Sequence, residues 1–289
     1  MNQENNQFVH LHTEYSLLDG ASRIHQLIDR AKELNMPAIA ITDHGSMYGV
    51  IDFYKAAKAK GVKPIIGCEV YVAPKSRFDK MAVDGESYYH LILLAENQQG
   101  YKNLIELVSL AYSEGFYYKP RVDKELLKKY HEGIICLSAC IAGEIPAAII
   151  RDNPERADVL VREYIDIFGK DNFFIEIQNH GMPEEKKANV ELVKLAEKYD
   201  LGLVATNDSH YTNRNDSEFH DVLLCIQMGK TVDEENRMRF PNDNFYLKSP
   251  EEMEKLFGAY RGAIENTVKI AERCQVDFVF GQLHLPVFP

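Results

Sequence analysis

The sequence has few features that would set it apart from ordinary globular proteins. It has no tryptophan, and its five cysteines include no Cys-x-x-Cys pair. The cysteines are Cys68, Cys136, Cys140, Cys225 and Cys274. Because the number of cysteines is odd and their positions are scattered, they fit reduced thiols in the cytoplasm better than a disulfide framework. No apolar run reaches the ~18 residues of a membrane span, and the polar residues 1–7 do not resemble a signal peptide. We therefore expect a cytoplasmic protein.

An excess of positive charge is also absent. The chain has 33 Lys and Arg against 44 Asp and Glu, which gives a formal net charge of −11. Modules that coat nucleic acids neutralise phosphates with surplus Lys and Arg, so this class is disfavoured. Metal ions can still supply local positive charge for a polyanionic substrate. The length of 289 residues fits one large α/β domain or two small ones.

Seven short apolar runs, rich in Val, Ile and Phe, are typical of buried parallel strands. They cover residues 8–11, 38–42, 64–72, 90–95, 133–137, 173–177 and 203–206. Amphipathic stripes between them predict helices, for example Ile24, Leu27, Ile28, Ala31 and Leu34, or Val190, Val193, Leu195 and Ala196. Further helices are expected at 214–229, from Pro250, and at 263–274. The alternation predicts a βα barrel or a doubly wound sheet. No Gly-rich phosphate loop of either common type is present.

Potential metal ligands follow five of the predicted strands. They are His10 and His12, Asp43 and His44, Glu69, Cys140, and Asp208 and His210. The carboxyl ends of parallel strands meet on one face, so we expect these side chains to converge there. His90 is an exception, because it begins its apolar run. Imidazole and carboxylate groups bind Zn²⁺, Mn²⁺ or Fe²⁺. Because these groups are too many for a single ion, we expect two or three ions.

Seven segments carry a resemblance to a known family. They read FVHLHTEYSLLDG (8–20), AITDHG (40–45), YYKPR (117–121), LSAC (137–140), FIEIQNHG (174–181), ATNDSHY (205–211) and FYLKSPEEM (245–253). Together they resemble the PHP (polymerase and histidinol phosphatase) family of metal-dependent phosphoesterases. The resemblance is closest to the PHP domains at the N-terminus of bacterial replicative DNA polymerase III alpha subunits.

The resemblance implies a distorted (β/α)7 barrel with a multinuclear metal site at the C-terminal rim of the strands. The nine implied ligands are His10, His12, Asp19, His44, Glu69, His90, Cys140, Asp208 and His210. Asp19 and Cys140 stand where other members usually have histidines. By the family pattern, a first metal would be held by His10, His12, Glu69 and Asp208. A second would be held by Glu69, His90 and Cys140, and a third by Asp19, His44 and His210.

The resemblance also implies an activity, a metal-dependent 3′→5′ exonuclease that proofreads DNA 3′ ends. His10, His12, Glu69 and Asp208 would act through two or three bound ions of Zn, Mn or Fe. Residues 1–280 would form the domain, and 281–289 a severed linker towards the remainder of the polymerase. Two alternatives stay open. One is a small-molecule phosphatase of the histidinol phosphatase type. The other is a metal-stabilised scaffold that docks a separate proofreading exonuclease subunit.

Several further residues receive weaker predictions. Asp43 is expected to orient a ligating imidazole. For His180, a role in supporting the metal site and no role in that site are equally expected. Candidate basic residues for steering a phosphate backbone are Lys75, Arg77, Lys119, Arg121, Arg237 and Arg239. Tyr117 and Tyr118 are candidates for stacking on bases. The remaining histidines, His25, His131, His220 and His284, are expected to lie away from the site.

Overall fold

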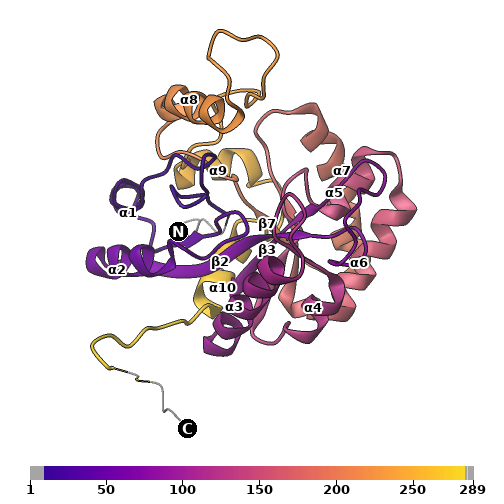
Figure 1. The fold of residues 1–289 in the computed structure, drawn as a ribbon, viewed down its shortest axis with the longest axis horizontal. Coiled ribbons are helices and arrows are strands. Elements are labelled where there is room, and N and C mark those ends of the chain that lie inside the picture. The colour runs from indigo at the N-terminus through magenta and orange to yellow at the C-terminus, as the bar shows by residue number, and fades with distance from the viewer. Residues whose placement is uncertain (1–9, 284, 286–289) are drawn as a thin grey trace.

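One curled sheet organises the protein, for which a computed structural model describes residues 10–283 and 285 (Figure 1). Its strands are β1 (Ala38–Ile41), β2 (Lys63–Val72), β3 (Tyr89–Ala95), β4 (Arg121–Val122), β5 (Ile134–Leu137), β6 (Phe173–Ile177) and β7 (Gly202–Ala205). Their order is β1-β2-β3-β5-β6-β7, and β4 pairs with β2 beside this path. Helices surround the sheet in Figure 1. The expected α/β barrel class is confirmed.

The sheet curls until the residues directly after β1 and those after β7 meet through the segment that follows His10. The Thr42 N–H donates to the Leu11 carbonyl over 3.0 Å, and the His12 N–H donates to the Ser209 carbonyl over 2.8 Å. Leu11 and Ser209 form a parallel bridge. Leu11 therefore takes the closing position through an isolated bridge, and residues 8 and 9 of the first predicted strand, 8–11, lie outside the described residues.

Strand β3 runs in the direction opposite to that predicted. It pairs antiparallel with both β2 and β5, with His90 opposite Tyr71 and Ile92 opposite Glu69. Apolar composition identifies a buried strand but carries no information about its direction. Because β3 is reversed, its first residues lie at the edge where the parallel strands end. His90 thus reaches the same rim as the other predicted ligands, which explains its exceptional position in the sequence.

Ten helices are seen among the described residues, and most cover the outer face of the sheet (Figure 1). They are α1 (Ile24–Glu33), α2 (Val50–Lys60), α3 (Gln98–Ser113), α4 (Lys124–Lys129), α5 (Glu144–Ile150), α6 (Pro154–Phe168), α7 (Pro183–Tyr199), α8 (Ser217–Met228), α9 (Pro250–Phe257) and α10 (Glu265–Arg273). Helix α9 starts as its sequence predicts, since Ser249 and Glu252 form a capping box around Pro250. None of the described helices has the length and apolarity needed to cross a membrane.

The buried face of α7 differs from the predicted stripe. Val190 is 57% exposed, whereas Ala188, Leu192 and Ala196 are buried. The stripe chosen from sequence was therefore rotated around the correct helix. The linker predicted for 281–289 falls partly on residues that are not described, and it stays a prediction.

Two hydrophobic clusters fill the two faces of the sheet. The larger lies between the strands and the outer helices. The smaller fills the barrel interior with alternate strand residues, among them Ile65, Ile92 and Phe174, and α10 contributes Ile270. Because side chains alternate along a strand, Glu69, His90 and Glu176 project from this same inner face. The interior is thus apolar at one end and polar at the rim.

Candidate metal centre

Four side chains aim one atom each at a common point in the rim. The Nε2 atom of His10 lies 2.9 Å from Oε2 of Glu69 and 3.1 Å from Oδ1 of Asp208. The Nε2 atom of His12 lies 3.1 Å from the same Asp208 oxygen and 3.3 Å from Nε2 of His10. Ligand atoms ~2.0–2.1 Å from a tetrahedral Zn²⁺ are roughly 3.3 Å apart. The spacing therefore fits a four-coordinate cation, and the four residues match one ligand group expected from sequence.

The two imidazoles of this group are held from behind. Nδ1 of His10 lies 2.7 Å from Oε1 of Glu176, an oxygen that also accepts from the Gln178 amide over 3.0 Å. A carboxylate only accepts, so the His10 proton sits on Nδ1 when a cation takes Nε2. Nδ1 of His12 lies 3.1 Å from Oγ of Ser16. Both rings thus direct Nε2 towards the common point.

Asp43 supports the site less directly than predicted. Its Oδ1 accepts from the Ser16 hydroxyl over 2.9 Å and from the Thr13 N–H over 2.6 Å. Ser16 in turn contacts His12, so Asp43 acts on the imidazole through a hydroxyl. This chain of hydrogen bonds fixes the loop that follows His12.

Glu69 joins this group to a second one. Its Oε1 lies 2.9 Å from Nδ1 of His44 and 2.6 Å from Nδ1 of His90, while Oε2 faces His10. His44, Glu69 and His90 could hold a cation together. The Cys140 Sγ approaches Nδ1 of His90 at 3.7 Å. Burial raises the pKa of the Cys140 thiol, so its thiolate would require a cation beside it.

The third predicted group gathers around Asp19 and includes one unexpected member. Nε2 of His44 lies 3.1 Å from Oδ2 of Asp19, and Nε2 of His210 lies 4.0 Å from Oδ1. His220, expected to lie away from the site, is buried on α8 with its Nε2 3.8 Å from the same Oδ1. His44 also stacks on His12 with ring centroids 3.9 Å apart. The structure therefore brings all nine predicted residues into one cluster and adds His220.

The electrostatics of the cluster keep its carboxylates ionised. Burial alone would raise the pKa of Glu69 and Asp208, but the surrounding imidazoles outweigh burial and hold both well below the usual range. Burial would lower the pKa of His44, yet Glu69 and Asp19 raise it to about 10. Burial and the neighbouring His12 lower the pKa of His210 to about 3. Ionised oxygens at the centre of imidazoles favour the binding of cations.

Two buried oxygens in the cluster have no hydrogen-bond partner among the described residues. They are Oδ1 of Asp19 and Oδ1 of Asp208. A buried acceptor without a donor is costly, and an ion is one of the ordinary explanations. Both atoms lie where the predicted groups would place a cation, so the residues present fit divalent metals.

Backbone strain concentrates at the same rim. Eight described non-glycine residues have a positive φ, and five of them, including Asp208 with a φ of 44°, are Asn or Asp residues, which tolerate it. The other three are Leu18, Tyr118 and Ala139, with φ of 63°, 60° and 65°. Leu18 and Ala139 directly precede the predicted ligands Asp19 and Cys140, and Asp208 is one itself. Such backbone conformations persist at functional sites, where the surrounding structure holds them in place.

Three of the six predicted phosphate-steering cations are engaged inside the protein. Arg77 is buried and paired with Glu114 at 2.6 Å and Asp123 at 3.0 Å. Arg237 is paired with Asp221. Arg121 is fully buried and donates to backbone carbonyls only. Lys119 differs, since it lines an open cavity together with Asp19 and His44. None of the other five predicted cations lines this cavity.

His180 has a structural environment next to the site. Its Nε2 lies 2.6 Å from the carbonyl oxygen of Asn207, its Nδ1 contacts Glu185, and its ring stacks on Phe245 at 3.9 Å. It therefore supports the backbone immediately before Asp208. Glu176, Gln178 and His180 alternate along the sequence at the end of β6, and it is Glu176 and Gln178 that contact the predicted ligand His10.

Replacing Glu176 with glutamine should lower the affinity of the protein for Zn²⁺ or Mn²⁺ by about tenfold, the lower end of the range for residues that orient a ligand. The amide keeps the size of the carboxylate but loses the anionic acceptor for the His10 proton. Titration against a competing chelator measures the change. Glu163→Gln, an exposed carboxylate paired with Lys124, is the control. Equal affinity in Glu176→Gln and wild type would contradict the role of Glu176.

Comparison with known proteins gives consistent results. The PHP domain family matches residues 9–180. The chain is 51% identical over 269 residues to the DNA polymerase III subunit alpha of Treponema pallidum, covering 93% of this chain and 23% of that protein. It is 49% identical to the DNA polymerase III subunit alpha of Thermus aquaticus, covering 97% of this chain and 24% of that protein. The chain thus spans about a quarter of these curated relatives.

Among solved structures, the chain is similar to a two-domain protein from Bacteroides vulgatus, described as containing a predicted PHP-like metal-dependent phosphoesterase. The identity is 14% and the TM-score is 0.44, and the match covers 78% of this chain and 56% of that protein.

Proposed function

The chain belongs to the PHP domain family, and from this premise we propose that it is the N-terminal PHP domain of a DNA polymerase III alpha subunit that hydrolyses phosphodiester bonds at DNA 3′ ends. The products would be those of a 3′→5′ exonuclease that proofreads. In this proposal residues 1–280 form the domain, and 281–289 lead towards the remainder of the polymerase. Its partners are DNA 3′ ends and the rest of that subunit.

The observation that carries the proposal is the dual position of Glu69. One of its oxygens faces His10 and the other faces His44 and His90, so a single carboxylate belongs to two ligand groups. Two or three divalent ions, of Zn, Mn or Fe, would supply Lewis acidity to a phosphodiester in such a cluster. Sites that flank a scissile phosphate with neighbouring cations are typical of nucleases and phosphatases.

The protein's own groups have defined tasks in this proposal. Glu176 and Ser16 fix the ring orientation of His10 and His12. The raised pKa of the buried Cys140 thiol makes it a poor free nucleophile, so we assign it a ligand role. The ionised Asp208 and Glu69 keep the rim negative until cations bind, which couples phosphate binding to metal binding.

Two variants of the purified 289-residue protein test the proposal. His12→Ala and Asp208→Asn should each lower the cleavage of a single-stranded 3′-ended oligonucleotide at least tenfold, because each removes one atom of the four-ligand group. Metal content, measured by plasma emission spectrometry, should fall with activity. Undiminished cleavage in either variant would mean that a contaminating nuclease is responsible.

The substrate used in the same assay separates the alternatives. Faster hydrolysis of a phosphomonoester such as histidinol phosphate than of the oligonucleotide would favour a small-molecule phosphatase. A wild-type protein that is folded and metal-loaded but cleaves neither substrate would favour a scaffold that docks a separate proofreading subunit. Either result would contradict the exonuclease proposal.

A further inference from the structure

An open cavity adjoins the candidate metal centre, and four tyrosines are among the residues that line it. They are Tyr15, Tyr48, Tyr71 and Tyr112, and they line the cavity together with Asp19, His44 and Lys119. We refer to the part formed by Tyr48, Tyr71, Tyr112 and Lys119 as the tyrosine cleft. Its residues come from the loop after β1, from β2, from α3 and from the turn before β4. Three of the four phenol rings that line the cavity thus come from separate elements and form the cleft beside two predicted ligands.

Tyr71 forms the buried base of the cleft and contacts the cluster directly. Its ring lies 6.1 Å from that of His44 and 5.3 Å from that of His90. Burial raises the pKa of its hydroxyl, so the group stays neutral and does not repel a phosphate. Tyr88 packs edge-on against this ring at 4.8 Å and also stacks on His90 at 6.0 Å. Tyr71 therefore gives the cleft a rigid apolar floor.

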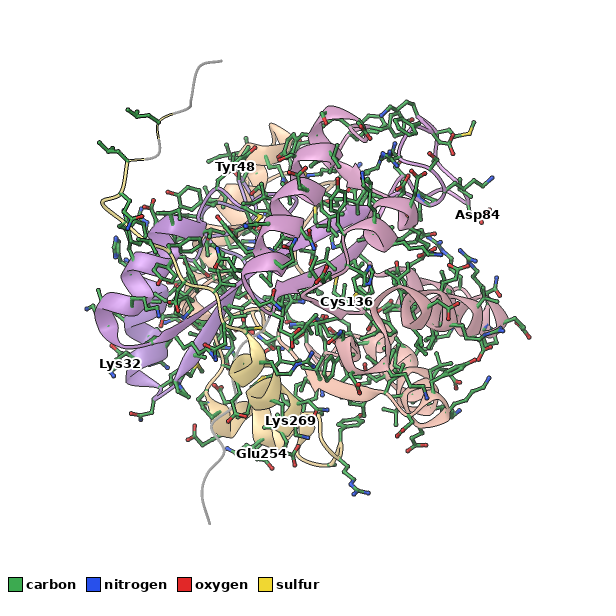
Figure 2. The ribbon with its side chains drawn as sticks, turned by 90° about the horizontal axis from the view of Figure 1, so that it is seen from below. Lys32, Tyr48, Asp84, Cys136, Glu254 and Lys269 are labelled. Carbon is green, nitrogen blue, oxygen red and sulfur yellow. The ribbon has the colours of Figure 1, made fainter. Side chains whose placement is uncertain are left out.

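Tyr48 and Tyr112 form the mouth of the cleft and remain accessible. Tyr48 is 59% exposed and Tyr112 is 41% exposed, and Tyr48 lies at the periphery of the molecule in Figure 2. Burial and a hydrogen bond with Tyr48 raise the pKa of the Tyr112 hydroxyl. Exposed aromatic surface beside a polar site commonly marks a place where a ligand binds.

Lys119 is the cation of the cleft and is free to meet an anion. Its Nζ lies 5.5 Å from the centroid of Tyr71, and no described carboxylate forms an ion pair with it. The turn that carries it is fixed, because the Tyr117 N–H donates to the Lys119 carbonyl over 3.0 Å and Tyr118 holds a φ of 60°. The other predicted cations of this region, Arg77 and Arg121, are buried in internal bonds.

We propose that the tyrosine cleft binds the unpaired terminal nucleotides of a DNA single strand, with bases stacked on Tyr48 and Tyr112 and a backbone phosphate on Lys119. This inference rests on the proposed function and names the part of the site that selects its substrate. Every base has a face that can stack on an aromatic ring, but only an unpaired base exposes it. The cleft therefore favours frayed or single-stranded ends over paired ones, and its cation places the adjoining phosphodiester near Asp19 and His44.

Binding of an uncleavable probe tests the cleft independently of hydrolysis. The probe is a 5′-fluorescein oligothymidylate with phosphorothioate linkages at its 3′ end, and a blunt duplex of matched length is the comparison. Fluorescence anisotropy should show that Tyr48→Ala and Tyr112→Ala each weaken single-strand binding about tenfold, the scale of one lost stacked base, while duplex binding changes little. Phe219→Ala, an exposed aromatic on α8, should leave both affinities unchanged.

Lys119 has its own signature in the salt dependence of binding. Lys119→Ala should reduce the slope of log K against log salt by about 0.7, the value for one phosphate contact with a single strand. Lys119→Arg should restore the slope. An unchanged slope in Lys119→Ala, or equal single-strand affinity in the tyrosine variants and wild type, would overturn the proposal.

The outcomes also separate this inference from the proposed function. If wild type cleaves 3′ ends but the cleft variants bind and cleave like wild type, the cleft assignment is wrong and the exonuclease stands. If tyrosine-dependent single-strand binding is present but no substrate is cleaved, the exonuclease is wrong and the cleft stands.

Discussion

Replacing Glu69 with glutamine should abolish nearly all phosphodiesterase activity, with a loss of at least ~1000-fold, or ~4 kcal/mol of transition-state stabilisation. The side chain would keep its size but lose its negative charge, and an NH2 group would replace one of its two oxygens. In the native protein, Oε2 faces His10 and His12 while Oε1 faces His44 and His90. An amide nitrogen cannot ligate a cation in place of either oxygen, so two ligand groups should fail together.

The control for this variant is Glu144→Gln. Glu144 is also a buried carboxylate, but it is bound by Lys124, Arg156 and Tyr164 on the outside of the sheet, each at 3.0 Å. Both variants should lose some resistance to urea, whereas only Glu69→Gln should lose bound metal in emission spectrometry. If Glu69→Gln retains its full metal content and activity, the bridging role of Glu69 is wrong.

The sequence predicted much of the fold because strand and helix signals are local. Alternating apolar runs identified six of the described strands, and the rule that ligands collect at strand ends singled out residues such as Glu69 and Asp208. The structure brings these residues together, while their role as ligands stays a prediction. His90 violated the rule only because β3 is antiparallel, and strand direction is decided by connections that composition does not encode.

What the sequence could not predict depends on long-range contacts. Glu176 faces His10 across 166 positions of the chain, and nothing local distinguishes it from the neighbouring Gln178. His220 sits on a helix whose sequence reads as ordinary, and only packing brings it to 3.8 Å from Asp19. Whether a charged side chain is buried or exposed also depends on long-range contacts. Arg121 and Lys119 lie two residues apart, yet one is fully buried and the other lines the open cavity.

Arg121 provides the second large effect, and it is an effect on stability. Its guanidinium donates to the carbonyl oxygens of Gly115 at 3.1 Å, Ser87 at 3.0 Å and Asp79 at 2.7 Å, and its ring neighbour is Tyr117 at 5.0 Å. These bonds join the loop after β2, the residues before β3 and the turn before β4. The residue was a candidate for contacting DNA, but its burial assigns it to holding these three segments together.

Arg121→Lys should therefore lower the free energy of unfolding by about 3 kcal/mol, since an ammonium cannot reproduce the fork of donors and leaves buried carbonyls unpaired. Urea denaturation followed by circular dichroism measures the change. Lys75→Ala, which removes an exposed cation from the nearby loop after β2, should leave stability within ~0.5 kcal/mol of wild type. Arg121 also anchors the turn that carries Lys119. Arg121→Lys should therefore weaken single-strand binding only indirectly, by loosening that turn. A variant with wild-type stability and a lowered salt slope would instead show that Arg121 contacts phosphate itself.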